Sequence, residues 1–214
     1  YLAHQMGIHK DQIKGVNFRK KIPGKFANEK GVSIKYSKGS SVLEKSEVVQ
    51  NLFGTDYGFG FFKYKACDYC DDIFAETADI TFGDAWLPKY MDKGTSLVVV
   101  RSNRMLTYFN QMVCEKHLVV ETLESIDAIN SQFAGIKHRR YGLQYRLFLD
   151  TINNKKVPIK RFLPSNKSIN YKYKIIQKFR IWIRHWSSIL FFEIRNKKDF
   201  SLFTFKTYFV WRLY

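Results

Sequence analysis

The sequence is poor in cysteine, in acidic residues and in long apolar runs, and each shortage limits what the protein can be. With 3 cysteines among 214 residues, the chain cannot build a disulfide framework, so we expect a reducing, cytoplasmic environment. No apolar run approaches the roughly 20 residues that a membrane-spanning helix needs, and no secretory signal is recognisable. Because the sequence opens at Tyr1 rather than at a methionine, we expect a fragment or a processed product.

Basic and aromatic residues are abundant, and they are unevenly distributed. Hydrophobic residues make up 45% of the chain and aromatic residues 17%, which favours a folded core over disorder. The net charge is +17, from 36 Lys and Arg against 19 Asp and Glu. Residues 158–214 alone hold 13 basic and 2 acidic residues, and 15 of the 36 aromatic ones. The sequence therefore predicts a moderately basic globular body followed by a basic, aromatic tail.

Hydrophobic periodicity predicts a mixture of strands and helices. Two strands are expected within residues 13–35 about the Pro23-Gly24 turn, buried strands at 80–82 and 97–100, and an edge strand at 118–120. Helices are expected at 104–116, 141–152 and, most clearly, 175–190. Because the strands and helices show no regular βαβ alternation, the predicted class is α+β: a mixed sheet with flanking helices and a C-terminal helical tail.

Cys67 and Cys70 form a C-x-x-C pair. Two thiolates at this spacing can hold one metal ion or one edge of an iron–sulfur cluster, because a tight turn brings both sulfurs together. A zinc site or a 4Fe-4S cluster needs four ligands, and we expect Cys114 to be a buried thiol within a helix. A thioredoxin-like redox pair and a chance pair also remain open. The missing βαβ context and the neighbouring carboxylates disfavour the redox pair.

Two short segments next to predicted strands could bind a flat, phosphorylated ligand. A glycine at a strand end lets the backbone approach a ligand, and an adjacent acid and tryptophan can accept a hydrogen bond and stack on a ring. Backbone N–H groups before the next strand could bind a phosphate. The candidate residues are Gly83, Asp84, Trp86, Gly94, Thr95 and Ser96. An ordinary turn followed by a tryptophan in the core would show the same sequence pattern, so this alternative stays open.

Two basic groups could hold a pyrophosphate or a carboxylate through forked hydrogen bonds. One contains Arg19 and Lys21, and the other is His138-Arg139-Arg140 with Arg146. Exposed, solvated charged surfaces would produce the same pattern of basic residues in the sequence. Motifs typical of hydrolases, kinases and dinucleotide-binding folds do not occur in the chain, so these classes have no support.

Two long motifs surround these candidates, KYKACDYCDD at residues 63–72 and AETADITFGDAWLP at residues 75–88. Shorter ones are AHQMG at 3–7, FRKK at 18–21, KGTSLVVVR at 93–101 and QFAGIKHRRYGLQYRL at 132–147. In these motifs the chain resembles the C-terminal region of the coenzyme F-420 hydrogenase/dehydrogenase beta-subunit family, in the branch that accompanies surface-polysaccharide genes. The resemblance covers roughly residues 1–162 and leaves 163–214 as a basic amphipathic helical tail.

The resemblance implies an iron–sulfur flavoprotein oxidoreductase that moves electrons between FAD and a 4Fe-4S cluster. It implies that Cys67 and Cys70 are cluster ligands, and that residues 83–86 and 94–96 lie near the flavin. Arg19 and Lys21 would then hold an anion in the same site. The substrate differs between branches of the family. It is the deazaflavin coenzyme in hydrogenases and formate dehydrogenases, a chlorophyll derivative in a plant reductase, and unknown in the polysaccharide branch.

Family members normally carry an upstream ferredoxin-like module and further cysteines, which this sequence does not contain. We therefore expect a missing N-terminal flavin-binding half, or a redox partner, to complete the cofactor sites, and the isolated chain to have little or no activity. Two alternatives stay open: a non-catalytic accessory protein at the membrane in glycan assembly, and structural zinc bound through the C-x-x-C pair. For the tail we expect docking on the body first, then an anionic membrane surface at the inner face, and nucleic acid last.

Overall fold

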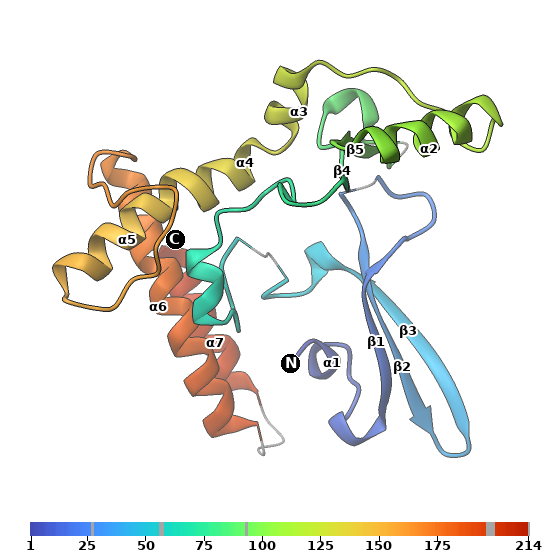
Figure 1. Ribbon diagram of the computed structural model, residues 1–214. Helices are drawn as coiled ribbons and strands as arrows, with labels where there is room; N and C mark the ends of the chain where they lie inside the picture. The colour runs from blue at the N-terminus through green and yellow to red at the C-terminus, as the bar shows by residue number, and fades with distance from the viewer. Residues whose placement is uncertain (27, 56–57, 93, 196–199, 214) are drawn as a thin grey trace. The chain divides into compact units, whose positions relative to one another are not determined.

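The computed structural model describes residues 1–26, 28–55, 58–92, 94–195 and 200–213, with side chains as far as residue 208. The fold is α+β, as predicted. The chain divides into two compact units, residues 1–68 with 169–214, and residues 69–168 (Figure 1). The division after residue 162, which follows the resemblance and the composition, stays a prediction.

The strands are β1 (Ile13–Lys20), β2 (Gly31–Lys38), β3 (Ser41–Val48), β4 (Ile80–Asp84) and β5 (Ser96–Val100). The α-helices are α1 (Leu2–Gln5), α2 (Asn103–Cys114), α3 (Ser125–Ser131), α4 (Phe133–Ile136), α5 (Gly142–Ile152), α6 (Tyr171–Ile194) and α7 (Ser201–Leu213). The 3-10 turns are η1 (Lys10–Gln12), η2 (Val49–Asn51), η3 (Lys65–Tyr69) and η4 (Pro88–Tyr90), and η5 (Lys137–Tyr141) is a π-helical turn.

An antiparallel sheet in the order β1-β2-β3 forms much of the first unit. The expected pair of strands around Pro23-Gly24 is confirmed as β1 and β2. The β2–β3 register pairs Lys38 with Ser41, so the hairpin loop has only two residues. Gly39 in this loop has φ +63°, a backbone conformation that such tight hairpin turns require and that glycine adopts without strain.

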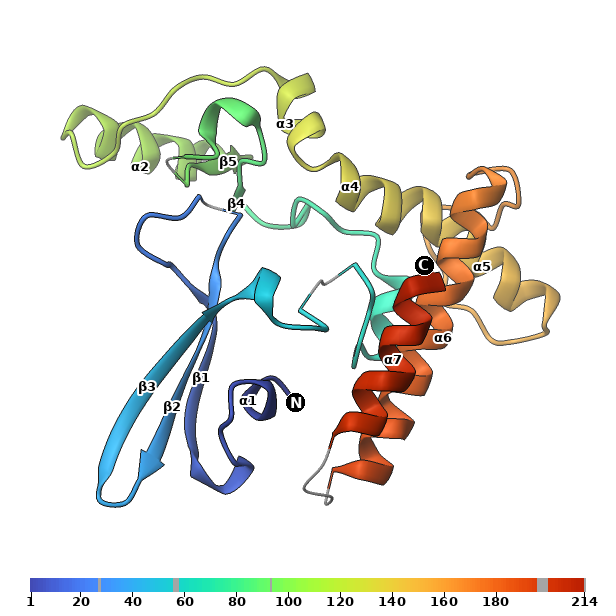
Figure 2. The same ribbon diagram turned by 180° about the vertical axis from the view of Figure 1, so that it is seen from behind.

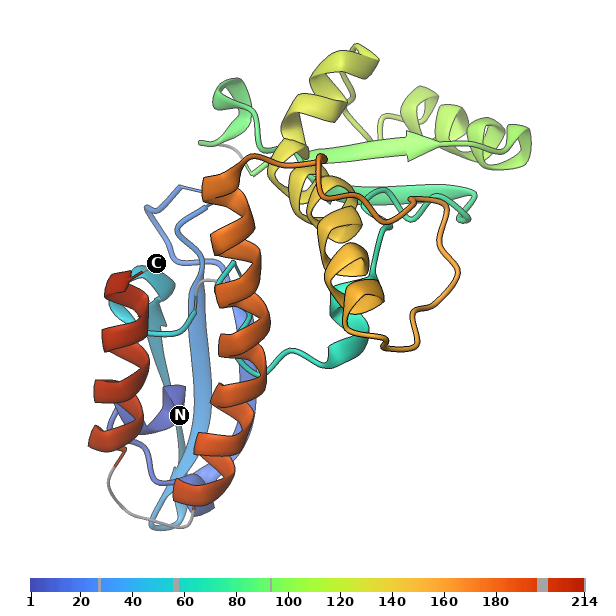
Figure 3. The same ribbon diagram turned by 90° about the vertical axis from the view of Figure 1, so that its left-hand side faces the viewer.

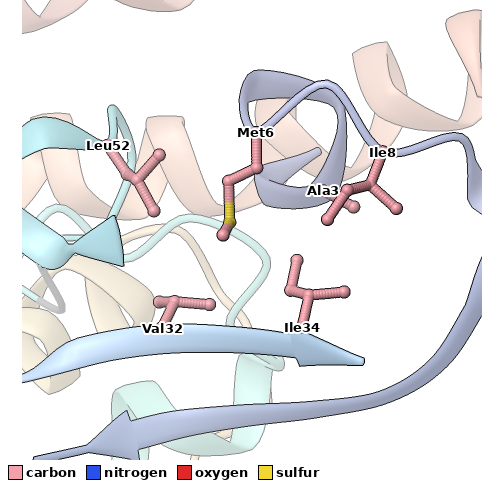
Figure 4. Packing of buried hydrophobic residues seen from close by; sticks show 6 residues of the cluster. All are labelled: Ala3, Met6, Ile8, Val32, Ile34 and Leu52. Carbon is pink, nitrogen blue, oxygen red and sulfur yellow. The ribbon is translucent and has the colours of Figure 1, made fainter. Parts of the chain in front are cut away.

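One face of this sheet is covered by the N-terminal segment around α1. Ala3, Met6 and Ile8 pack against Val32 and Ile34 of β2, with Leu52 closing the cluster (Figure 4). The ammonium group of Lys45 in β3 donates a hydrogen bond to the carbonyl oxygen of Met6 at 2.7 Å. The apolar side chains of β2 alternate with polar ones, so burial of this face fixes which side of each strand points inward.

The predicted tail helix is confirmed as α6, and a further helix, α7, packs beside it (Figure 3). Asn170 caps α6, since its side-chain oxygen accepts a hydrogen bond from the Tyr173 N–H at 2.9 Å. Leu190 and Ile194 of α6 bury their side chains against Phe203 of α7. The two helices therefore form a hairpin that belongs to the first unit.

The second unit contains the antiparallel pair β4–β5 and most of the remaining helices (Figure 2). The predicted helices at 104–116 and 141–152 are confirmed as α2 and α5. α4, η5 and α5 follow one another without a break. Leu143, Tyr145 and Leu147 of α5 are buried, so α5 contributes to the core of this unit.

Three expectations are wrong. Residues 118–120 form no strand, and Val119 is fully exposed, because no neighbouring strand is present among the described residues to pair with this apolar triplet. Cys114 is exposed rather than buried, since α2 buries none of its residues. β4 is only partly buried, and Phe82 is largely exposed, because a two-stranded sheet cannot enclose both of its faces.

Within the described part of the chain, none of the helices combines the length and the apolarity needed to cross a membrane.

Candidate functional site

The C-x-x-C pair spans the point in the sequence where one unit ends and the other begins. Cys67 is part of the 3-10 turn η3, and Cys70 follows the end of that turn. Both are free cysteines with partly exposed side chains. The N–H of Cys67 donates to the carbonyl oxygen of Tyr64 at 3.0 Å, and the thiol of Cys70 contacts the carbonyl oxygen of Asp72 at 3.7 Å. The boundary between the units falls after Asp68, so each cysteine is described with its own unit.

Helix α6 anchors the segment around Cys67. The carboxylate of Asp68 pairs with Nε of Arg184 at 2.7 Å, and both side chains are at least four-fifths buried. Three residues further along α6, the Ser187 hydroxyl accepts a hydrogen bond from the Phe62 N–H at 3.2 Å. Phe62 has φ +57°, a left-handed conformation that is strained for an aromatic residue and persists only where the surroundings hold it. The first cysteine therefore lies in a firmly held segment.

Cationic side chains anchor the segment that follows Cys70 in the second unit. The Asp71 carboxylate pairs with Lys160 and with Arg161, each at 3.3 Å. The Glu76 carboxylate pairs with Arg140 and Arg161. These ion pairs tie the acidic stretch after the cysteine to three residues, Arg140, Lys160 and Arg161, that are more than 60 residues away in the sequence.

Further hydrogen bonds hold the backbone and the start of the same segment. Nη1 of Arg139 donates to the carbonyl oxygen of Asp72 at 2.6 Å, and the Tyr69 hydroxyl donates to the Asp150 carboxylate at 2.7 Å. Arg139 lies in the π-helical turn η5, an irregularity that is common at functional sites. Residues 69–76 are thus held by partners from η5, α5 and the segment around residue 160.

These contacts shift the pKa values of the two acids. The hydrogen bond from Arg161, supported by the charges of Arg161 and Arg140, outweighs partial burial and lowers the pKa of Glu76 below its ordinary value of 4.5. For Asp71, burial acts to raise the pKa, but the hydrogen bond from Lys160 and the charges of Lys160 and Arg161 together lower it below 3.8. Both side chains are therefore carboxylates at neutral pH.

Arg101 organises the loop between Cys70 and β4. Its guanidinium group donates to the carbonyl oxygens of Phe74, Ala75 and Ala78 and to the hydroxyl of Thr81, at 2.9 to 3.3 Å. Ala75 has φ +47°, a conformation that costs an alanine energy. One arginine side chain thus fixes the strained turn that follows the cysteine motif.

The six candidate ligand-binding residues come together at one end of the β4–β5 pair. The register places Asp84 opposite Ser96, and Gly83 opposite Leu97. The Ala85 N–H donates to the carbonyl oxygen of Thr95 at 3.1 Å. Gly83, Asp84 and Trp86 are partly buried, whereas Gly94, Thr95 and Ser96 are exposed.

Several backbone groups of this hairpin end are already engaged. The Gly94 N–H donates to the carbonyl oxygen of Tyr90 at 3.2 Å. The Trp86 N–H donates to the Ser131 hydroxyl at 3.1 Å, and the carbonyl oxygen of Asp84 accepts from the Gln132 amide at 2.7 Å. The exposed groups left for a ligand at this end include the hydroxyls of Thr95 and Ser96.

The basic residues that the sequence singled out are divided between the two units of the chain. Arg19 is exposed on β1, and Lys21 is exposed just after it, so both belong to the first unit and their relation to the hairpin end stays a prediction. Arg139 and Arg140 anchor the segment after Cys70. Arg146 is buried in α5 and donates to the carbonyl oxygen of His138 at 3.1 Å, which is a structural contact.

The sequence pointed to Arg139 and Arg140 but missed their companions Lys160, Arg161 and Arg184. No local spacing connects these residues with the cysteines, because they lie on segments that only the fold brings near. The one available signal was the run of acids around the cysteine pair, which needs cationic partners if it is to be partly buried.

The donor set limits what the cysteine pair can hold. Among the residues that the structure describes, no three His, Cys, Asp or Glu side chains gather closely enough to hold a metal ion. The chain has one further cysteine, Cys114, and that thiol is exposed on α2. Cys67 and Cys70 are therefore at most two of the four ligands that a zinc ion or a 4Fe-4S cluster needs.

The chain is thus an α+β protein with two free, partly exposed cysteines at C-x-x-C spacing. Residues 1–126 match the family described as the C terminus of the coenzyme F420 hydrogenase/dehydrogenase beta subunit, and the chain belongs to this family. Its role is accordingly of the hydrogenase/dehydrogenase beta-subunit type, among the oxidoreductases. The match includes the cysteines and the β4–β5 pair but ends before residues 132–147, where the resemblance was expected to continue. No curated protein and no solved structure matches the chain.

Proposed function

We propose that the protein transfers electrons as a beta-subunit-like oxidoreductase, with Cys67 and Cys70 as two thiolate ligands of a 4Fe-4S cluster. The observation that carries the proposal is the state of this pair: two free, partly exposed thiols between segments that are each held by ion pairs. When bound, the cluster accepts and passes on single electrons. The residues of the chain hold its ligands in place and adjust the charge around them.

Anchoring matters because a redox site works best when its ligands move little as its charge changes. The Asp68–Arg184 pair holds the turn that contains Cys67, and the pairs of Asp71 and Glu76 hold the stretch after Cys70. Partners behind the ligands orient them and adjust their chemistry. The ion pairs of Asp68, Asp71 and Glu76 support such an orienting role behind Cys67 and Cys70.

Charged side chains of both signs meet at the segment after the second cysteine. Four cationic side chains, those of Arg139, Arg140, Lys160 and Arg161, contact the segment after Cys70. The same segment carries the carboxylates of Asp71, Asp72 and Glu76, and three of the cations are paired with Asp71 or Glu76. These contacts hold the segment in place behind the proposed cluster ligands.

The remaining cluster ligands have to come from elsewhere, because the described residues supply two. We propose that they come from a ferredoxin-like N-terminal half or from a separate redox partner. The isolated chain should then show little turnover.

The flavin is proposed to bind at the end of the β4–β5 pair. The exposed hydroxyls of Thr95 and Ser96 can donate to a phosphate or a ribose, Asp84 can accept a hydrogen bond, and Trp86 offers an aromatic ring. FAD exchanges electrons in pairs or singly, and so can connect a two-electron substrate with a one-electron cluster. Arg19 and Lys21 would contact its anionic groups. Surface-polysaccharide synthesis is the proposed setting, for which the sequence resemblance is the only support.

Cluster reconstitution with single-cysteine variants tests the proposal. The full chain is incubated without oxygen with ferrous iron, sulfide and a small thiol that can complete the ligand set. We expect iron and a visible absorbance band for the wild type and for Cys114→Ser, whose exposed thiol makes it the matched control. Cys67→Ser and Cys70→Ser should lose both signals. Retention of iron by these two variants would show that the pair is not the ligand set.

Titration with FAD, followed by flavin fluorescence, tests the proposed flavin site at the end of the β4–β5 pair. Replacing Trp86 by leucine should weaken FAD binding, because a stacking ring is lost. Phe82→Leu is the control, since Phe82 is an exposed ring on the same strand pair. Equal affinities of both variants would rule out Trp86 as a flavin contact.

A further inference from the structure

Helix α6 presents a row of apolar side chains to solvent along its whole length. The row consists of Tyr171, Ile175, Trp182, Ile189 and Phe192, which we call the α6 stripe. Their spacing of four, seven, seven and three residues keeps them on one side of the helix. Each is between 39% and 76% exposed. The opposite side of α6 is buried within the first unit through Ile183, Leu190 and Ile194, among others.

Basic side chains accompany the stripe. Lys174, Lys178 and His185 follow one another at helical spacing of four and seven residues, which places them on the same side of the helix as the stripe. The guanidinium group of Arg195 lies 4.0 Å from the centre of the Phe192 ring, at the end of the stripe. Glu193 is the one acidic residue between 171 and 195. The exposed side of α6 therefore combines large apolar side chains with basic ones.

The aromatic members of α6 are arranged as in helices that lie in a membrane interface. Trp182 and Trp186 stack with ring centroids 5.0 Å apart, and Trp182 remains exposed. Indole and phenol rings prefer the boundary between lipid headgroups and acyl chains, and lysines at the border of an apolar face contact anionic headgroups. Trp186 also packs against the cluster that Leu190 and Ile194 form with Phe203 of α7, whereas Trp182 is not named in that cluster.

We propose that the α6 stripe binds an anionic lipid surface, with Lys174 and Lys178 on the headgroups. Charge complementarity identifies the occupant, because residues 158–214 hold 13 basic and 2 acidic residues. Nucleic acid fits less well, because its phosphates contact cations, whereas this side of α6 exposes five large apolar side chains. The proposal is independent of the electron-transfer role.

Vesicle flotation of the full chain tests the proposal. Vesicles of phosphatidylcholine alone are compared with vesicles that also contain phosphatidylglycerol. We expect binding to the anionic vesicles that weakens as salt is added. Equal binding to both compositions, or binding to neither, would overturn the proposal. Displacement of the chain from anionic vesicles by a short single-stranded oligonucleotide at equal phosphate concentration would also overturn it in favour of nucleic acid.

Two double variants, each with a matched control, test whether the lipid-binding surface lies on α6. Each lysine near an anionic membrane contributes about fivefold in affinity, so Lys174→Gln with Lys178→Gln should weaken binding about thirtyfold. The control removes the same charge from the first unit at Lys10 and Lys14, which are exposed far from α6 in the sequence. It should lose much less affinity.

The apolar pair is Ile175→Gln with Ile189→Gln, for which we expect at least about tenfold weaker binding. Val16→Gln with Val42→Gln is its control, since both valines are exposed on the sheet of the same unit. Every replaced side chain is exposed except that of Lys174, which is half-buried, and circular dichroism checks that the variants fold. Equal losses in a stripe variant and its control would contradict the assignment to α6.

Discussion

Replacing Glu76 by glutamine should destabilise the second unit, because two arginines share its charge. The carboxylate pairs with Arg140 and Arg161, and its side chain is 28% exposed. A charge-assisted hydrogen bond of this kind contributes about 1.5–3 kcal/mol, while glutamine keeps one neutral acceptor. Because Arg161 is nearly half exposed and water screens its pair, we expect a net loss of about 1–2 kcal/mol.

Thermal unfolding followed by circular dichroism measures the effect. For a unit of this size the loss corresponds to a fall in Tm of roughly 5–10 °C. Glu121→Gln is the matched control, because Glu121 pairs with Lys89 in the same unit but both side chains are more than half exposed. Its Tm should not change measurably. A Glu76→Gln variant that melts like the control would refute the idea that these cations anchor the segment after Cys70.

The pH dependence of the same variant provides a second check. The pKa of Glu76 in the folded protein is below 4.5, so its contribution is complete above that pH and is lost as the pH falls through the lower folded value. The difference in free energy of unfolding between the wild type and Glu76→Gln should therefore be constant near neutral pH and shrink in acid. A difference that grows as the pH falls would contradict the assigned direction of the shift.

Three further predictions concern residues around the site. Lys116→Gly should stabilise the protein by about 0.5–1 kcal/mol in urea unfolding, because Lys116 has φ +60° in the turn that ends α2; destabilisation would contradict this. Leu143→Ala should cost about 3 kcal/mol in the same assay, since Leu143 is fully buried in α5, and a loss below about 1 kcal/mol would show that α5 is not core. Arg101→Met should speed amide hydrogen exchange in residues 74–81 at least about tenfold while leaving β1–β3 unchanged; unchanged exchange there would refute its role in holding the loop.

The periodic parts of the fold could be predicted from the sequence. Apolar and polar residues alternate on both sides of Pro23-Gly24. This pattern depends only on neighbouring residues, and it correctly predicted β1 and β2. The same holds for α2, α5 and α6, whose apolar positions recur at helical spacing. Residues 118–120 show the limit of such patterns, because a short apolar run becomes a strand only if a partner strand is present.

Burial and long-range pairing were harder to predict. Cys114 occupies an apolar position of α2, but the whole helix stays near the surface, so its thiol is exposed. The partners of Asp68, Asp71 and Glu76 are distant in the chain, and their contacts depend on how the helices pack. By contrast, the approach of residues 94–96 to 83–86 follows from the pairing of two adjacent strands. The sequence thus identified the cysteines and the hairpin end, but not the ion pairs around the cysteines.

The metal content of the protein tests the central claim most directly. Iron, acid-labile sulfide and zinc are measured per chain after isolation without oxygen, in the presence of the proposed ferredoxin-like half or partner. The account predicts iron and sulfide in equal amounts, lost in the Cys67→Ser, Cys70→Ser double variant and retained in Cys114→Ser. Zinc in place of iron, or iron that survives the double variant, would contradict it.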